Sequence, residues 1–470
     1  MLSKLSTPHL YSNTYTDNVE GFLLVYNPIS EHGISILNKE AAFLFNLIDG
    51  KKKLDDFFNL AKKESAEVEF HDIERVFNDF FHSEIIFFDS PKNKNIIFQK
   101  PPKHLGVWLH VTNQCNLRCK YCYVRKTNEK MNKKTGVKAI QNIIRDAKKN
   151  NFKKITIKFS GGECLLEFNY VLELIKLTRT LAKKADIKSD FVVLTNGVLL
   201  SEKIANTLKE KKIRAAISLD GLQKYNDNRV FPSGKSSFSY VEKGINNLLK
   251  IKVPFNVSIT ITSKNIENIP DLTKYLLKRN IPFAFNFYRE NPYVKEELEG
   301  DDKKLVKYLR EAYLLIYNNP PRYSLINGLL DRVTFSKPHL YTCGMGNSYI
   351  VVRQDGRIVP CQMTLEKPIG SIDDLDLIKT MKDGNFVKPI GLTVEGKNPC
   401  HTCQWKYICC GGCPLLTFKQ KGKYIVNSPC CAVYKALIPE VLRIEAKRLI
   451  KYGIRDNEGH IGEMPSQLPL

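Results

Sequence analysis

Cysteine is absent from the first part of the chain, and long apolar runs are absent throughout. No cysteine precedes Cys115, and no run of about 18 or more apolar residues occurs. The opening segment "MLSKLSTPHLYSNTYTDN" also lacks the basic and then apolar pattern of a secretory signal. These absences exclude a membrane-spanning helix and predict a soluble, cytoplasmic protein without membrane partners.

The thirteen cysteines that are present are clustered, and seven of them lie between Cys400 and Cys431. A reducing cytosol disfavours structural disulfides, so clustered cysteines there usually bind metal or take part in chemistry. With 470 residues the chain has room for roughly two to four domains, each with its own core.

Acidic residues are in deficit, with 49 Asp and Glu against 72 Lys and Arg and a net charge of +23. A solvated basic surface accounts for this balance. An acidic peptide partner is the second interpretation, because a basic field speeds its encounter. No compact basic helix with base-reading residues is present, so a nucleic-acid partner is not expected.

Residues 1–95 predict a small α+β domain. Two strands, "FLLVYN" and "GISILN", precede three helices, the first of which is capped by Asn38 and stops at Gly50. The apolar segment "EIIFFD" closes this region. The polar, proline-bearing segment "DSPKNKNIIFQKPPKH" then indicates a linker, which we place at 96–104.

From 105 to 325 the pattern alternates between strand and helix. The six segments expected as strands are "VWLHV", "ITIKF", "FVVL", "AAISL", "FNVSITI" and "FAFNF". An amphipathic stretch follows each of them. Such alternation indicates an α/β fold of parallel β–α units, and six units make a partial (β/α)6 barrel rather than the closed form.

Four motifs follow or end the first four of these strands: "CNLRCKYCY" (115–123), "SGGE" (160–163), "TNG" (195–197) and "SLDG" (218–221). Barrels of this kind build their active sites at the carboxyl ends of their strands, so the motifs are predicted to share one pocket. Thiolate sulfur suits zinc or iron–sulfur clusters, but a structural zinc needs a fourth protein ligand that this loop does not offer. Three thiolates on a four-iron cluster leave one iron open.

With "GGE" at the next strand end, the spacing of Cys115, Cys119 and Cys122 resembles the signature of radical S-adenosylmethionine (SAM) enzymes. The resemblance covers the barrel region. It implies that these cysteines bind a [4Fe–4S] cluster whose open iron chelates SAM. One electron then cleaves SAM to a 5′-deoxyadenosyl radical, which takes hydrogen from a substrate. A flavodoxin or ferredoxin would supply the electron.

The same resemblance assigns SAM contacts by position. The residues implied are Tyr121 for the adenine, Gly161, Gly162 and Glu163 for the methionine amino group, Ser218 and Arg229 for the ribose and carboxylate, and Asn196 for the pocket lining. The competing interpretations are an ordinary loop for "GGE", a helix cap for Ser218 and a solvent-facing charge for Arg229. Cys164 stands where these enzymes often carry proline, and is either a small buried residue or a thiol close to the radical.

Residues 340–435 resemble the SPASM extension of peptide-modifying radical SAM enzymes. The resemblance implies two auxiliary [4Fe–4S] clusters, one held by Cys343, Cys361 and Cys413 and the other by Cys400, Cys403, Cys409 and Cys431. The first set lacks a fourth cysteine, spacing does not separate Cys430 from Cys431, and Cys410 is spare. A pair of zinc knuckles is the alternative. Residues 436–470 are expected to form a C-terminal helix and tail.

Residues 1–95 resemble in pattern the winged-helix-like element that binds leader peptides in ribosomally made, post-translationally modified peptide (RiPP) systems. In that family the leader adds a strand to the small sheet. A winged helix that binds DNA is the alternative.

The chain is therefore predicted to be a radical SAM oxidoreductase, a peptide maturase of the SPASM subclass. It would bind a precursor peptide through its leader and form a thioether or carbon–carbon crosslink. The alternatives are an anaerobic sulfatase maturase that makes formylglycine, and a peptide-binding or electron-transfer iron–sulfur protein without SAM chemistry. No catalytic residue beyond the cofactor contacts is assigned.

Overall fold

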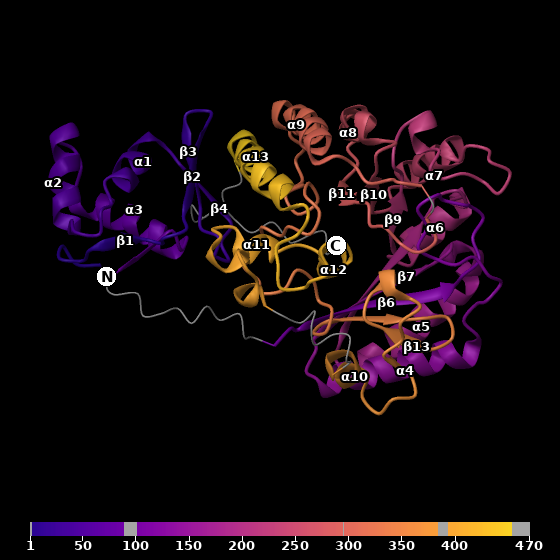
Figure 1. The fold of residues 1–470 in the computed structure, drawn as a ribbon. Helices are drawn as coiled ribbons and strands as arrows, with labels where there is room; N and C mark the ends of the chain where they lie inside the picture. The colour runs from indigo at the N-terminus through magenta and orange to yellow at the C-terminus, as the bar shows by residue number, and fades with distance from the viewer. Residues whose placement is uncertain (1, 89–100, 295, 384–392, 454–470) are drawn as a thin grey trace.

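The computed structural model describes residues 2–88, 101–294, 296–383 and 393–453. The N-terminal unit lies at one end of the molecule, and the cysteine-rich C-terminal segments lie between it and a large curved sheet (Figure 1). The linker predicted at 96–104 falls largely outside the described residues. Within those ranges, no helix combines the length and the apolar character that a bilayer crossing requires.

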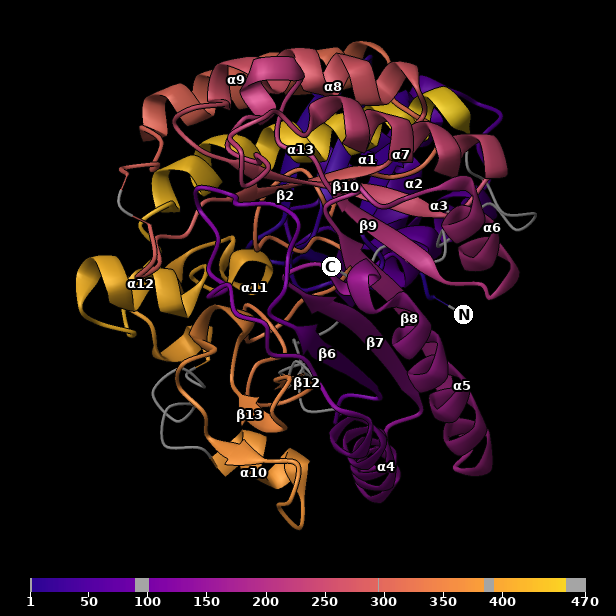
Figure 2. The same ribbon diagram turned by 90° about the vertical axis from the view of Figure 1, so that its right-hand side faces the viewer.

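The large sheet confirms the predicted partial barrel. Its six parallel strands are β6 (His104–Thr112), β7 (Lys154–Gly161), β8 (Lys188–Thr195), β9 (Arg214–Ser218), β10 (Phe255–Ile261) and β11 (Phe283–Phe287), in that spatial order. Five of the six strand segments predicted from the sequence fall within them, and the sixth, "AAISL", extends one residue past the end of β9 at Ser218. The helices that follow them are α4 (Lys133–Lys149), α5 (Phe168–Lys184), α6 (Glu202–Glu210), α7 (Phe238–Ile251), α8 (Ile269–Lys278) and α9 (Asp302–Asn318). They lie outside the curved sheet (Figure 2).

The sheet continues beyond the six predicted strands. β12 (Tyr349–Val352) pairs in parallel with β6, and antiparallel β13 (Arg357–Val359) and β14 (Gly370–Ser371) follow. The cysteine-rich region therefore shares a sheet and a hydrophobic core with the barrel. α10 (Leu377–Asp383) packs beside α4 at this end.

The N-terminal unit contains the three predicted helices, α1 (Lys39–Asn46), α2 (Leu54–Glu64) and α3 (Phe70–His82). Asn38 caps α1 as expected, because its Oδ1 accepts a hydrogen bond from Ala41 N at 2.9 Å. The two predicted strands are β3 (Phe22–Tyr26) and β4 (Ile34–Leu37). The structure adds β2 (Tyr15–Val19) beside β3, and a separate antiparallel pair of β1 (Pro8–Leu10) and β5 (Ile86–Phe88), with β5 lying in "EIIFFD".

Strand β3 is buried on both faces. Leu23 and Val25 pack in the core of the N-terminal helices, whereas Leu24 and Tyr26 belong to the core that includes the barrel. The long helix α13 (Cys431–Tyr452) packs against β2 and β4 of the same sheet. The N-terminal unit is thus packed onto the rest of the chain.

Ion pairs support this packing. Arg443 Nε of α13 lies 2.6 Å from Asp17 Oδ2, and Lys447 Nζ lies 2.9 Å from Glu20 Oε1. α13 also runs across the domain boundary that the sequence predicts between 435 and 436. The C-terminal helix therefore begins inside the cysteine-rich region.

Candidate functional site

The carboxyl ends of β6 to β9 carry the four predicted motifs. β6 ends at Thr112, just before the cysteine loop (115–123), and β7 ends within "SGGE" at Gly161. β8 ends at Thr195 and β9 at Ser218. These strands are parallel neighbours in the sheet, so their ends share one edge. The four motifs therefore lie at one edge of the sheet, as expected, and their sharing of one pocket stays a prediction.

Backbone hydrogen bonds hold the cysteine loop against the barrel. They run from Arg118 N to Val230 O at 2.7 Å, from Lys120 N to Asn228 O at 2.8 Å and from Met131 N to Val111 O at 2.8 Å. The middle of the loop and the segment after it are therefore both fixed by the protein itself, as a preorganised site requires.

The loop brings the thiols of Cys115, Cys119 and Cys122 within range of one another's charge. Burial raises the pKa of the Cys119 thiol to about 12, an effect that Arg229 opposes and the neighbouring thiols reinforce. Burial also raises the pKa of the Cys115 thiol. Such thiols ionise only when a cation stabilises the thiolate, so metal binding here would release protons.

The two glycines of "SGGE" are required by the cysteine loop, whose backbone passes close to them. A Cβ at Gly161 would lie 2.2 Å from Thr112 O, and the φ of Gly161 is +147°. A Cβ at Gly162 would lie 2.1 Å from Gln114 O. The amides of Gly162 and Glu163 donate to these same two carbonyls, at 2.7 and 2.8 Å. The segment is therefore a close backbone contact rather than an ordinary loop.

Glu163 is buried, and its carboxylate is held by donors of the chain itself. Its Oε1 accepts from Thr195 Oγ1 at 2.8 Å and from Leu165 N at 3.1 Å, and its Oε2 accepts from Asn196 N at 2.7 Å. The hydrogen bonds from these donors lower the pKa of this carboxyl group, but burial has the larger effect and the pKa is raised. Among the described residues Oε2 accepts one bond, so it keeps acceptor capacity for one more donor.

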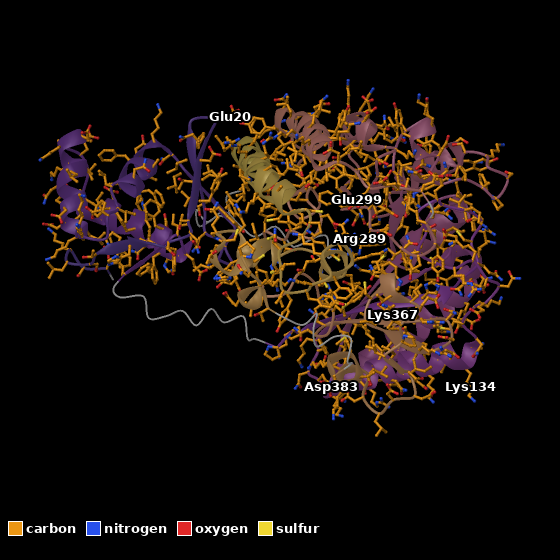
Figure 3. All side chains as sticks on the ribbon, in the orientation of Figure 1. Glu20, Lys134, Arg289, Glu299, Lys367 and Asp383 are labelled. Carbon is orange, nitrogen blue, oxygen red and sulfur yellow. The ribbon has the colours of Figure 1, made fainter. Side chains whose placement is uncertain are left out.

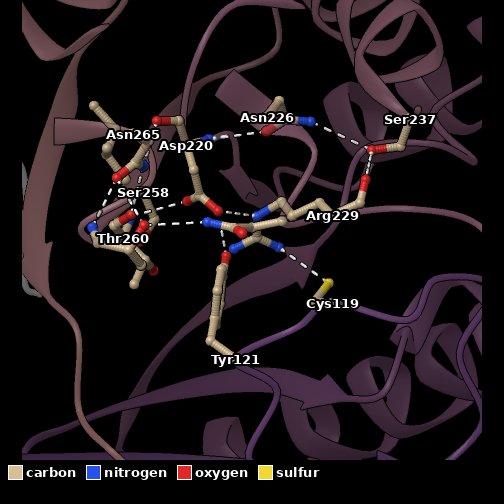
Figure 4. A network of polar contacts seen from close by, with 12 residues as sticks. Cys119, Tyr121, Asp220, Asn226, Arg229, Ser237, Ser258, Thr260 and Asn265 are labelled. Atoms are coloured by element: carbon tan, nitrogen blue, oxygen red, sulfur yellow. Dashed lines mark hydrogen bonds and ion pairs between the residues drawn. The ribbon is translucent and has the colours of Figure 1, made fainter. Parts of the chain in front are cut away.

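Figure 4 shows a polar network that joins the cysteine loop to β9 and the segment after it. The Tyr121 hydroxyl donates to the Asp220 carboxylate, and Arg229 Nε lies 2.6 Å from Asp220 Oδ2. The guanidinium carbon of Arg229 lies 5.1 Å from the Tyr121 ring centre. Burial would lower the pKa of Arg229, but Asp220, Tyr121 and Cys119 together outweigh burial and the pKa is raised. Arg229 is thus a buried, paired cation and not a solvent-facing charge.

Asn196 and Ser218 complete the predicted SAM contacts. Asn196 Nδ2 donates to Asn116 Oδ1 of the cysteine loop at 2.7 Å. Ser218 ends β9 and pairs in register with Ser258 of β10. The next helical turn begins only at Gln223, so Ser218 is not a helix cap. Every predicted SAM contact therefore lies at or beside one edge of the sheet.

In the C-terminal region the thiols of Cys343, Cys361 and Cys413 lie within range of one another's charge. The guanidinium groups of Arg289 and Arg332 act on them as well, and Arg289, labelled in Figure 3, has only 12% of its side chain exposed. Burial raises the pKa of Cys361 to about 12. At Cys413 the two guanidinium groups outweigh burial, and the thiol pKa is lowered.

A second C-terminal group contains Cys400, Cys403, Cys409 and Cys431, whose charges act on one another. Its last thiol stands on the first residue of α13. Burial raises the pKa of the adjacent Cys430 to about 12, and the carboxylates of Asp331 and Asp302 raise it further. The charge of Cys431 acts on Cys400 and Cys409, and its assignment to this group in place of Cys430 stays a prediction.

All thirteen cysteines are free thiols. Cys164 and Cys410 are fully buried, and their Sγ atoms contact Leu194 O at 3.3 Å and His339 O at 3.0 Å. No three His, Cys, Asp or Glu side chains within the described ranges converge on a point that a single metal ion would occupy. A four-iron cluster does not need its thiolates to converge on one point, because each thiolate binds its own iron. The three groups of thiols fit such clusters by the chemistry of their donors.

Four charged residues of these sites were missed from the sequence: Lys126, Asp220, Arg289 and Arg332. Asp220 stands inside the "SLDG" motif, so the motif itself was the signal for it. Lys126 follows Cys122 in the same loop, and its Nζ lies 3.0 Å from the Cys122 sulfur. Neither of the two arginines lies in or beside a cysteine motif.

Comparison with known proteins agrees with this geometry. The Radical SAM superfamily model matches residues 109–276. The uncharacterized protein MJ0907 of Methanocaldococcus jannaschii is 32% identical over 60% of this chain and 92% of its own length. A cysteine-type anaerobic sulfatase-maturating enzyme of Clostridium perfringens is 27% identical over 68% of this chain and 91% of its own.

Two further similarities extend the comparison. The radical SAM cyclopropyl synthase TigE of Paramaledivibacter caminithermalis is 20% identical over 95% of this chain and 98% of its own. The solved structure of native anSMEcpe with bound AdoMet and Cp18Cys peptide shares the fold, with a TM-score of 0.61 at 24% identity over 74% of this chain and 99% of that one. Since the protein from M. jannaschii is matched over nearly its whole length and the family model covers the strands that carry the four motifs, this chain belongs to the radical SAM superfamily, whose cofactors are a [4Fe–4S] cluster and SAM.

Proposed function

We propose that the chain is a radical SAM peptide maturase of the SPASM type, which binds a precursor peptide by its leader and forms a thioether or carbon–carbon crosslink. The observation that carries the proposal is the gathering of three, three and four thiols, from distant parts of the chain, into separate groups within one fold. One group suffices to cleave SAM. The other two indicate a reaction in which the substrate gives up an electron.

In this proposal Cys115, Cys119 and Cys122 hold the [4Fe–4S] cluster that, when bound, supplies the electron that splits SAM into methionine and a 5′-deoxyadenosyl radical. Glu163 Oε2 keeps acceptor capacity at this edge, and it would take the SAM amino group together with the backbone carbonyls of "GGE". Arg229, fixed by Asp220, would present its remaining N–H donors to the SAM carboxylate.

The remaining predicted contacts would each bind a different part of SAM or line its pocket. The Tyr121 ring would pack on the adenine, because its hydroxyl is tied to Asp220 and its ring orientation is therefore fixed. Ser218 would reach the ribose, and Asn196, bonded to Asn116, would line the pocket beside the cysteine loop.

The balance of the substrate reaction explains the other two thiol groups. Each crosslink removes two hydrogen atoms from the peptide. One goes to 5′-deoxyadenosine, the other leaves as a proton, and one electron remains. For a thioether the cysteine thiol releases that proton as the sulfur–carbon bond forms. The cysteines that would hold an acceptor for the electron are Cys343, Cys361 and Cys413 in one group and Cys400, Cys403, Cys409 and Cys431 in the other.

The N-terminal unit is proposed as the leader-binding element. Its three-stranded sheet has the order β2, β3, β4, so β2 and β4 are the edges. An extended peptide that joins such an edge gains backbone hydrogen bonds, and side-chain pockets then give specificity. Direct binding of a fluorescent leader peptide to the full chain, measured by anisotropy, tests this part of the proposal. Specific binding of DNA instead would favour the alternative winged-helix function.

A search for a short reading frame beside the gene, then co-expression of the peptide it encodes and mass spectrometry of the product, tests the reaction. A crosslink removes two hydrogen atoms, whereas epimerisation leaves the mass unchanged. Anaerobically reconstituted enzyme should carry about twelve iron atoms per chain, for three cubane clusters. The triple variant Cys115→Ala, Cys119→Ala, Cys122→Ala should keep about eight and release no 5′-deoxyadenosine. Zinc in place of iron, or about four iron atoms per chain, would contradict the auxiliary clusters.

An anaerobic sulfatase maturase is the second candidate, because the C. perfringens enzyme matches at 27% identity over 91% of its length. That match covers 68% of this chain, whereas the TigE match covers 95% and therefore includes most of the N-terminal unit. Incubation with a cysteine-containing sulfatase peptide separates the two candidates. Formation of an aldehyde, trapped by a hydrazide, would favour the maturase, and its absence beside a modified precursor would favour the crosslinking enzyme.

A further inference from the structure

The three thiols of the cysteine loop each face one nitrogen donor from a side chain. The pairs are Asn196 Nδ2 with Cys115 Sγ at 3.8 Å, Arg229 Nη1 with Cys119 Sγ at 3.9 Å and Lys126 Nζ with Cys122 Sγ at 3.0 Å. Lys126 therefore makes the shortest of these contacts, and it carries a full charge.

The charge of Lys126 is not neutralised by a neighbouring carboxylate. Within the described ranges it forms no ion pair, whereas Arg229 is paired with Asp220 at 2.6 Å. Lys126 lies four residues after Cys122, in the same loop. Its ammonium group acts on all three thiols and also on Glu163. Within the described ranges it is thus a cation without an ion-pair partner, and it lies beside Cys122 at the predicted cluster site.

A cation in this place affects the reduction of a cluster more than its binding geometry. Reduction adds one negative charge, and a positive charge a few ångströms away stabilises the reduced form, most strongly where the surroundings have a low dielectric constant. Hydrogen bonds to the sulfur ligands are among the known determinants of iron–sulfur potentials. Lys126 supplies both effects, because its N–H group points at a sulfur and carries the charge.

We propose that Lys126 is a positioning residue that raises the reduction potential of the cluster held by Cys115, Cys119 and Cys122, so that an external one-electron donor of the flavodoxin or ferredoxin class is able to reduce it. This inference rests on the proposed function, since it requires a cluster on these three cysteines. The electron comes from the donor and adds to the oxidised cluster, and no bond forms or breaks at Lys126 in this step.

The test is a redox titration of anaerobically reconstituted enzyme, followed by electron paramagnetic resonance without any precursor peptide. The signal of this cluster is the one that changes when SAM is added, because SAM binds its open iron. Lys126→Met removes the charge at similar length, Lys126→Gln keeps an N–H donor without the charge, and Lys126→Arg keeps both. Lys130→Met is the matched control, because Lys130 is exposed in the same loop and pairs with Glu167 at 3.1 Å.

Lys126→Met should lower the midpoint potential by about 59 mV or more, which is a tenfold change in the one-electron equilibrium. Lys126→Gln should lower it by a smaller amount, because it keeps an N–H donor, whereas Lys126→Arg and Lys130→Met should leave it close to that of the wild type. A Lys126→Met protein with an unchanged potential and weakened SAM binding would overturn the inference, and would make Lys126 a contact for SAM. That result leaves the proposed function intact, whereas a wild-type protein without a cluster on these cysteines would overturn both.

Discussion

Replacing Gly162 by alanine should force the "SGGE" turn away from the cysteine loop. The added Cβ would lie 2.1 Å from Gln114 O and 2.7 Å from Asn113 O, and these are backbone atoms that cannot rotate aside. Real Cβ contacts essentially never fall under 3.0 Å, so the two segments must separate by at least the difference between 2.1 and 3.0 Å.

The magnitude follows from the contacts that this movement breaks. The hydrogen bonds from Gly162 N to Thr112 O and from Glu163 N to Gln114 O would be lost, at about 1 kcal/mol each. Over-packing adds about 1–3 kcal/mol. The free energy of unfolding should therefore fall by about 3–5 kcal/mol. The same movement displaces Cys115, the residue after Gln114, and a shift of about 1 Å at a reacting site costs about 100-fold in rate.

Urea unfolding followed by circular dichroism measures the first effect, and release of 5′-deoxyadenosine under dithionite measures the second. Gly300→Ala is the control, because a Cβ there would meet only Ile266 Cδ1, at 3.5 Å. We expect that control to stay within about 0.5 kcal/mol of the wild type. If Gly162→Ala unfolded at the same urea concentration as the wild type and cleaved SAM at the same rate, the close packing of the two segments would be refuted.

Three other predictions concern SAM binding, pH and the N-terminal unit. Arg229→Lys should weaken SAM binding by about 1.5–3 kcal/mol, because a lysine ammonium group does not replace the two parallel hydrogen bonds that a planar guanidinium group donates to a carboxylate. Unchanged SAM affinity in a calorimetric titration would remove Arg229 from the SAM site. Burial lowers the pKa of His110 to about 4, so its neutral form contributes stability that is complete above about pH 6.5 and is lost as the pH falls towards 4, by about 3 kcal/mol. His110→Gln should reduce that loss in melting curves across this range, and an identical pH dependence would show that another group is responsible. Deletion of residues 1–95 should yield mostly insoluble protein, because it uncovers Phe335 and other apolar neighbours of β3, and a soluble deletion that melts like the full chain would contradict the shared core.

The barrel strands could be predicted because each is buried and gives an apolar run, as "FVVL" and "ITIKF" do. β2 could not be predicted in this way, since "YTDNV" buries only Val19 and the strand forms because it pairs with β3. The short strands β12 to β14 extend the sheet through pairing with β6, a contact between segments far apart in the chain. Local pattern carries no information about such pairing.

The same distinction holds for the candidate site, where some residues could be predicted from the sequence and others could not. Cysteine spacing indicated the group of Cys115, Cys119 and Cys122, which lie close together in one loop, whereas the two C-terminal groups were implied by the resemblance to the SPASM extension. The charged partners of these thiols could not be found like this. Asp220 and Arg229 are paired by a turn, and Arg289 acts on Cys413 only because the C-terminal region folds back onto β11 and the segment after it. Those contacts depend on tertiary structure, so the sequence gives no periodic or spacing signal for them.

The burial of β3 on both faces affects how the chain folds as it is made. Synthesis adds about 5–20 residues per second, so β3 leaves the ribosome about 20–80 s before α13, which packs on the same sheet. In that interval Leu24 and Tyr26 face water, although the helices beside the other face are already complete. The nascent chain thus exposes an apolar strand surface of the kind that chaperones bind and that aggregates when left uncovered. Slower translation should therefore increase the insoluble fraction, and added chaperone should reduce it.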